Sequence, residues 1–377
     1  MIYLIGISIT VFLALVLIGK QKKSLSDKIL LIWLLVIAGH LFLYYLNISN
    51  KLYDYPFLLG IHLPYPLLHG PLLYLYTAAL TNKISTKNYS WLFHFIPILP
   101  FYAYLVPFFN LKEEEKIEIF QNGGAGYEAF LMINIWSIFI SGIVYVSISL
   151  YLLKQYKESI KNNFSFTEKI NLSWLRYLIY GIGFIWLLVF LGNDNAVFGV
   201  TVLYVVFLGF FGIRQVGIFS HNLRTIPLNT HNNNSDSILP KNKSESNLAK
   251  TKYAKSTLTD DQASEIHKAL TRAIEDDKLY KNPELTLSAL ASTLDVHPNN
   301  LSQVINSFEE KNFYDYINEK RVNAFINMVA KLENRRFTLL SLALDCGFNS
   351  KPSFNRNFKK VTGLSPTEYI LQLKKEV

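Results

Sequence analysis

Cysteine is almost absent from this chain, since Cys346 is the only one among 377 residues. One thiol cannot form an intrachain disulfide, and it cannot build a thiolate metal cluster. We therefore expect Cys346 to be a small, buried, apolar side chain. Charged residues are also scarce: they make up 17% of the chain, compared with about 25% in average soluble domains. With half of its residues hydrophobic and a mean hydropathy of +0.20, the chain is too apolar for an average soluble protein.

The short motifs of common catalytic sites are missing as well. The sequence contains no HExxH zinc motif, no GxSxG nucleophile elbow, no phosphate-binding P-loop and no carboxylate pair spaced for acid–base chemistry. We therefore expect no enzymatic activity, no cofactor and no bound metal.

Apolar residues, by contrast, are in excess: half of the chain is hydrophobic, 15% is aromatic and the mean hydropathy is +0.20. Each long apolar segment has about 18 to 25 residues, enough to cross roughly 30 Å of hydrocarbon at about 1.5 Å per residue. Prolines enter the third and fourth segments, where they would kink a membrane helix rather than exclude it. The segments are predicted near 2–19, 28–47, 65–82, 91–109, 129–153, 172–191 and 197–219.

The loops between these segments alternate in charge. The first, third and fifth loops are basic, the fourth (110–128) is acidic, and the second and sixth carry few charges. Because basic loops stay in the cytoplasm, this alternation predicts an external N-terminus and a cytoplasmic C-terminus. The run 2–19 has its lysines behind it rather than in front, so we expect an uncleaved membrane helix instead of a signal peptide.

The composition changes abruptly after the last apolar segment. Residues 220–257 are polar and nearly free of large apolar side chains, which predicts a flexible linker without a core. Thirty-odd such residues span about 30 Å. A domain at 258–377 would then have room to reach a partner beside the bilayer.

The stretch from Thr338 to Tyr369 predicts two short helices joined by a tight turn. Thr338 can cap the first helix, and Gly347 permits a positive φ in the turn. The second helix begins near Ser350 and is basic on its outer side, an arrangement typical of a helix-turn-helix. Its apolar residues are expected to face inward; they are Phe354, Phe358 and Val361.

The sequence LALDCGFNSKPSFNRNFKKVTGLSPTEY resembles the C-terminal signature of the AraC/XylS transcription regulators. The resemblance extends upstream to about Leu258, and Asp345 stands where the family usually has Glu. It implies two helix-turn-helix units on one connecting helix, with LSQVIN in the first unit. The residues agree: Thr286 can cap a short helix before PNNLSQVIN, and residues 313–332 read as a helix about 30 Å long. That length suits the spacing of about 34–36 Å between successive major-groove faces.

Outward polar residues on the two second helices are the predicted DNA contacts. Arg suits guanine edges and Asn suits adenine edges, so Arg356 and Asn355 are expected to read bases. Lys359 and Lys360 are expected to hold phosphates. The first unit offers only uncharged contacts, so it either reads bases with little phosphate affinity or acts mainly as a spacer. The predicted set is Asn299, Ser302, Gln303, Asn306, Lys351, Ser353, Asn355, Arg356, Lys359 and Lys360.

Two polar residues in the apolar half are candidate ligand-binding residues, His69 and Asn134. A polar group at membrane depth is a functional hypothesis by default. The alternatives for His69 are that it shapes the kink at Pro71 or donates a hydrogen bond between helices.

We interpret the chain as an all-α protein in three parts: a seven-helix transmembrane sensor domain (1–219), a flexible polar linker (220–257) and an AraC-like double helix-turn-helix DNA-binding domain (258–377). It would lie in the bacterial cytoplasmic (inner) membrane as a multi-pass protein with the DNA-binding domain in the cytoplasm. The expected partners are promoter or operator DNA, the lipid bilayer, a second copy in a homodimer, and an unknown small-molecule or membrane-derived signal. The alternative is a transporter, membrane enzyme or receptor whose helix-turn-helix tail serves protein interaction.

Overall fold

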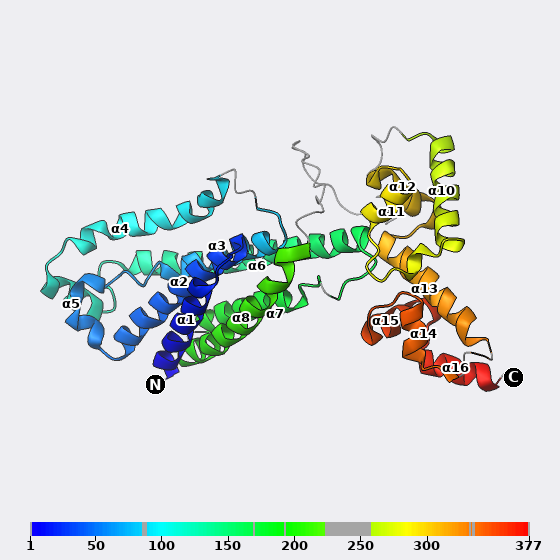
Figure 1. Cartoon of the computed structure of the whole chain (residues 1–377). Coiled ribbons are helices and arrows are strands. Elements are labelled where there is room, and N and C mark those ends of the chain that lie inside the picture. The colour runs from blue at the N-terminus through cyan, green and yellow to red at the C-terminus, as the bar shows by residue number, and fades with distance from the viewer. Residues whose placement is uncertain are drawn as a thin grey trace. The chain divides into compact units, whose positions relative to one another are not determined.

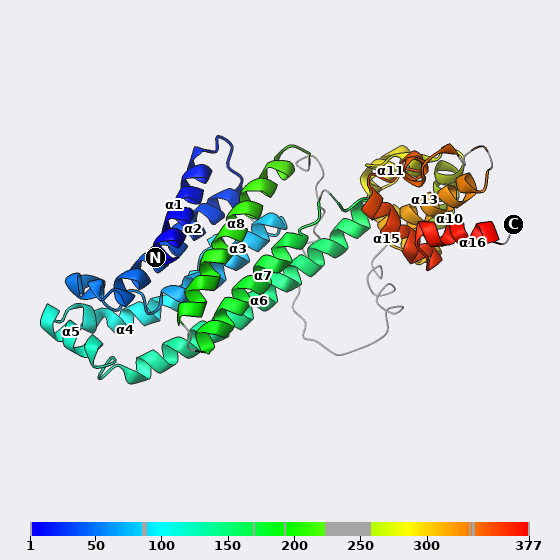
Figure 2. The same ribbon diagram turned by 90° about the horizontal axis from the view of Figure 1, so that it is seen from below.

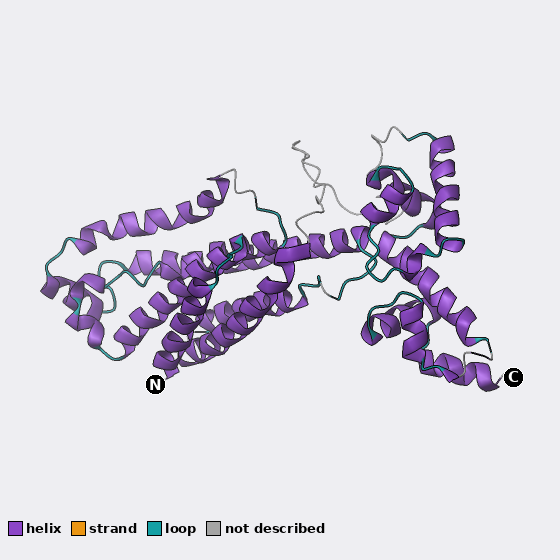
Figure 3. Ribbon diagram, in the orientation of Figure 1, coloured by secondary structure: helices purple, strands orange, loops and turns teal. Residues whose placement is uncertain are grey.

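The structure is a computed structural model of the whole chain. It describes residues 2–84, 89–168, 170–191, 194–222, 258–331, 333 and 336–375. Every named element in this part of the chain is a helix, as the all-α prediction required, and Figure 3 shows no strand there. From residue 223 onward the predicted linker lies outside the described residues.

The chain divides into two compact units, which we describe separately. The first unit comprises Met1–Tyr156 and Leu172–Arg224, and the second comprises Lys157–Asn171 and Thr225–Val377. The segment Lys157–Asn171 thus belongs with the C-terminal residues, although it lies between two apolar helices in the sequence.

The first unit is a bundle of apolar helices (Figures 1 and 2). Buried side chains such as Trp33 and Leu34 fill its interior. Gly142 lets α6 and α7 approach closely, since a Cβ there would lie 2.7 Å from the Trp186 ring. The helices are α1 (Ile2–Gly19), α2 (Leu25–Ile48), α3 (His69–Leu80), α4 (Leu99–Phe109), α5 (Glu113–Gln121), α6 (Glu128–Asn163), α7 (Ser173–Phe190) and α8 (Asp194–Asn222).

Among the residues that the structure describes, four helical stretches are long and apolar enough to cross a membrane: α2, residues Tyr89–Phe109, α6 and α7. Shorter apolar helices cover Tyr3–Gly19 and Ala196–Gly212. In the third apolar segment the α-helix has only 12 residues, because the proline-containing stretch before it adopts 3-10 turns. The count of seven membrane helices therefore stays a prediction.

The second unit consists of two helical groups on either side of α13 (Phe313–Val329), as Figure 1 shows. Side chains cap its helices as the sequence predicted: Thr286 and Thr338 each accept a backbone N–H three residues ahead. The other helices are α10 (Asp260–Glu275), η5 (Leu279–Lys281), α11 (Leu287–Thr293), α12 (Pro298–Glu309), α14 (Leu339–Asp345), α15 (Lys351–Thr362) and α16 (Pro366–Lys375).

Each helical group has its own core, and α13 contributes to both. Its first half packs with α10, α11 and α12 around Leu290 and Ile317, and its second half packs with α14 and α15 around Phe325. Cys346 is fully buried in the second core, as predicted. Val361 was expected to face this core but is 38% exposed, because it lies at the edge of α15, where it lines a surface pocket with Asp315 and Lys360.

Candidate nucleic-acid interface

α15 is held by its apolar face and presents its polar face outward. The Ser350 side chain caps its first turn by accepting the Ser353 N–H at 3.3 Å. Phe354 and Phe358 stack on Phe325 of α13, with ring centroids 4.6 and 5.6 Å apart. The opposite face, one residue per turn, leaves Lys351, Asn355 and Lys359 exposed as the sequence predicted.

Ser353 does not lie as the sequence predicted. Ser353 is only 3% exposed, because it sits on the face of α15 that turns toward Tyr314 of α13. Asn357 links the two helices by donating to the Ser353 carbonyl at 2.9 Å and to the Tyr314 hydroxyl at 2.8 Å. Lys360 is engaged in an ion pair with Asp315, 2.7 Å away.

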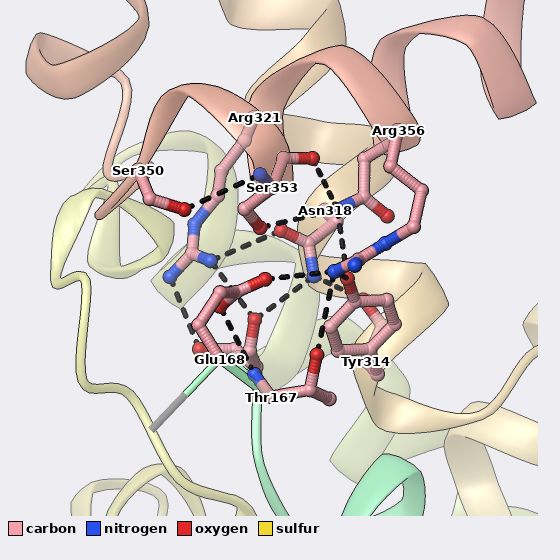
Figure 4. Close-up of polar contacts among 10 residues, drawn as sticks. Thr167, Glu168, Tyr314, Asn318, Arg321, Ser350, Ser353 and Arg356 are labelled. Carbon is pink, nitrogen blue, oxygen red and sulfur yellow. Dashed lines mark hydrogen bonds and ion pairs between the residues drawn. The ribbon is translucent and has the colours of Figure 1, made fainter. Parts of the chain in front are cut away.

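Arg356 carries the most contacts of the predicted base-reading residues (Figure 4). Its guanidinium donates to a Glu168 carboxylate oxygen at 2.7 Å, to the Tyr314 hydroxyl at 2.9 Å and to the Thr167 hydroxyl at 3.3 Å. The side chain remains 53% exposed. Arg356 is therefore at the surface, but one of its two terminal nitrogens, Nη2, already has protein partners.

Glu168 is held as a carboxylate by these contacts. Burial raises the pKa of this carboxyl, but hydrogen bonds from backbone N–H groups, Ser353 and Arg356 outweigh burial, so the pKa lies below its ordinary value of 4.5. At neutral pH a negative charge therefore stands against α15.

The connecting helix α13 contributes a polar stripe that sequence reasoning missed. Tyr314, Asn318 and Arg321 are spaced by four and three residues, so they share one face of the helix. All three are buried. Burial lowers the pKa of Arg321 to about 10, while Tyr314 and Glu168 oppose that shift, so the guanidinium stays charged at neutral pH. A long buried cation on a helix predicted to be a plain connector is the signal that could have revealed this site.

The first helix-turn-helix unit, made of α11 and α12, presents its predicted contacts on α12. His297 caps this helix by accepting the Asn299 N–H at 3.2 Å. Asn299 is exposed, whereas Ser302, Gln303 and Asn306 are half-buried. The Asn306 amide donates back to the Ser302 carbonyl at 2.7 Å, which fixes its orientation on the helix surface. No basic side chain lies on α12.

His69 and Asn134, the predicted ligand-binding residues, do not share a site. His69 accepts a hydrogen bond from the Trp33 indole at 3.3 Å, contacts the His40 ring nitrogen at 3.0 Å, and lines an apolar cavity of about 70 Å³ with both. Asn134 donates to the Leu63 carbonyl at 2.7 Å. Their ligand-binding role stays a prediction. The described residues contain no group of three or more His, Cys, Asp or Glu suited to a metal ion.

A protein-family model matches the C-terminal part of the chain. Residues 290–372, from within α11 to within α16, match a helix-turn-helix domain family of the AraC type. Neither the curated proteins nor the solved structures gave a match. The matched range begins within α11 and contains α12 to α15 whole, with the polar faces of α12 and α15. The C-terminal part of this chain is therefore an AraC-type helix-turn-helix domain with a DNA-binding, regulatory role.

Proposed function

We propose that this chain is a membrane-embedded transcription regulator, in which a signal received by the apolar helices of residues 1–219 changes sequence-specific DNA binding by residues 258–377. The observation that carries the proposal is the combination, in one chain, of an AraC-type helix-turn-helix domain with several helices long and apolar enough to cross a bilayer.

The surface chemistry of the apolar helical bundle supports the membrane part of the proposal. Large apolar side chains point outward from the bundle: Phe12 is 64% exposed, Leu15 is 59% exposed and Leu203 is 71% exposed. Such side chains gain little from contact with water but are suited to lipid. The basic surface of α15 supports the DNA part, since Lys and Arg supply phosphate affinity.

The test uses the full chain reconstituted in lipid nanodiscs. Selection from a randomised duplex pool should enrich one sequence class, and that duplex should bind more tightly than a scrambled one. Enrichment of no sequence would contradict the DNA-binding part of the proposal.

Reporter fusions after residues 24, 50, 86, 118, 162 and 222 test the membrane part. The alternation of loop charge predicts that successive fusions report opposite sides, with the last in the cytoplasm. Two neighbouring fusions on the same side would contradict seven crossings.

A further inference from the structure

A short segment between α6 and α7, residues 164–168, is built into the second unit. Phe164 is 5% exposed and Ser165 is 1% exposed. Phe164 forms an antiparallel bridge with Thr286, and the Ser165 N–H donates to the Leu285 carbonyl at 3.1 Å. The segment therefore attaches through backbone hydrogen bonds at the start of α11. We call residues 164–168 the docked segment.

Arg321 anchors the docked segment to α13 (Figure 4). Its guanidinium makes five hydrogen bonds, and two of them go to Ser165, to the carbonyl and the hydroxyl, each at 3.1 Å. The other three go to acceptors of the C-terminal domain itself. Asn318 also donates to the Ser165 carbonyl, at 2.9 Å. A buried cation needs all of its donors satisfied, so the docked segment completes a polar network that the domain alone leaves unfilled.

The tip of the docked segment contacts α15 beside its exposed polar face. The Glu168 carboxylate accepts from Arg356 at 2.7 Å and also from the Ser353 hydroxyl, which lies on the buried side of the helix. A phosphate or a guanine edge would offer oxygen acceptors to the same Arg356 guanidinium. One carboxylate therefore occupies the side chain that is predicted to read guanine.

We infer that the docked segment is an intramolecular competitor of DNA: Glu168 holds Arg356 when no duplex is bound, and DNA must displace it. This inference rests on the proposed function, and it names how the second helix-turn-helix unit is regulated. Because the segment joins α6 to α7 in the chain, a movement of either helix end would pull on it. A signal in the apolar helices then needs no separate messenger to reach α15.

The expected gain in DNA affinity depends on the fraction of molecules in which the docked segment has left α15. A competitor lowers the apparent affinity in proportion to the fraction of molecules whose site is free. A partly exposed, charge-assisted contact of this kind contributes about 0.7–1.4 kcal/mol, which corresponds to about a three- to tenfold change in affinity.

The experiment compares Glu168→Ala with Glu158→Ala in the full chain in nanodiscs. Glu158 is exposed near the end of α6, also within Lys157–Asn171. Both variants remove one negative charge, so the non-specific gain in DNA attraction is matched. Affinities are measured for the selected duplex and a scrambled one. Hydrogen exchange of the peptide covering residues 160–168 is measured with and without DNA.

The inference predicts that Glu168→Ala binds the selected duplex about three- to tenfold more tightly than Glu158→Ala. It also predicts that DNA speeds exchange of the docked segment in the Glu158→Ala variant. If the two variants had equal affinities and still preferred the selected duplex, the inference that the docked segment competes with DNA would be overturned. The proposed function would remain intact. Preference for no duplex by any form would overturn the proposed function. Unchanged exchange of the docked segment in Glu168→Ala without DNA would show, separately, that Glu168 does not hold it.

Discussion

The two helix-turn-helix units share a fold but differ in charge. α12 contains no Lys or Arg, whereas α15 contains four basic residues and no acidic one. Because Lys and Arg supply most phosphate affinity, the second unit should provide attraction to the duplex, and the first should contribute contacts to base edges. The docked segment contacts α15, the basic unit, through Arg356, while Lys351 and Lys359 stay exposed. The contact is therefore made on the unit from which most DNA affinity is expected.

The turns of the two units also differ. The residue after the C-cap has a positive φ in both: Asp295 at 52° in the first turn and Gly347 at 93° in the second. Asn and Asp tolerate this region, so the first turn does not require glycine. At Gly347 a Cβ would lie 2.5 Å from the Tyr280 carbonyl oxygen. The second turn is therefore packed against backbone of the first helical group, and only glycine fits.

The largest expected effect is on stability at these two turns. Gly347→Ala should destabilise the second helix-turn-helix unit by about 3 kcal/mol or more, because it adds both an unfavourable φ and a clash with backbone. Asp295→Gly should change the free energy of unfolding by less than about 1 kcal/mol, because relief of the strained φ is offset by the extra entropy of unfolded glycine. Chemical denaturation of both variants measures the difference. Similar losses would show that the turns are equivalent.

Arg356 and Lys359 should differ in how they support DNA binding. Arg356→Ala should weaken binding to the selected duplex by about 1–3 kcal/mol and relax the preference at one or two base positions. Lys359, one turn further along α15 and exposed, should act through phosphate. Lys359→Ala should weaken all duplexes alike and reduce the salt slope by about 1. Titrations at several salt concentrations decide this, and equal losses on selected and scrambled duplexes for both variants would make α15 a non-specific clamp.

Local features of the two helix-turn-helix units were predictable from the sequence. The caps at Thr286 and Thr338, the positive φ at Gly347 and the burial of Phe354 and Phe358 are confirmed. Each depends on residues within one or two turns of each other, so the signal lies in the local spacing. In the apolar helical bundle of the N-terminal part, the structure places prolines in 3-10 turns. There, length and hydropathy alone cannot fix a helix boundary.

The contacts around Arg356 were not predictable in the same way. Glu168 lies 188 residues before Arg356 in the sequence, and no periodic pattern connects residues so far apart. Ser353 was expected to face outward because it is polar, yet it is buried against α13 and Glu168. Only the polar stripe on α13 hinted at a partner, and it did not reveal which segment would fill it.

A smaller effect on DNA binding is expected from the first helix-turn-helix unit. Gln303→Ala should weaken binding to the selected duplex by about 1 kcal/mol and change the base preference on one side of the site. The salt slope should stay constant, because a neutral side chain releases no counterion. Salt titrations beside those of Lys359→Ala measure both quantities. If Gln303→Ala left affinity and preference unchanged, α12 would be a spacer, and the contrast between the two units would be one of function as well as charge.

The smallest effect expected is that of pH on the docked segment. The pKa of Glu168 is lowered in the docked state, so docking gains full stability above the ordinary value of 4.5 and loses it as the pH falls through the lowered pKa. Between about pH 6 and 8 the carboxylate is charged in both states, so its contribution should not change. Hydrogen exchange of residues 160–168, corrected for the intrinsic pH dependence, should accelerate below about pH 4.5 in wild type, whereas in Glu168→Gln the corrected rate should stay level. Exchange in α12 in the same samples reports general unfolding in acid. Acceleration of the docked segment and α12 together, in both proteins, would mean that the domain unfolds before Glu168 is protonated in place.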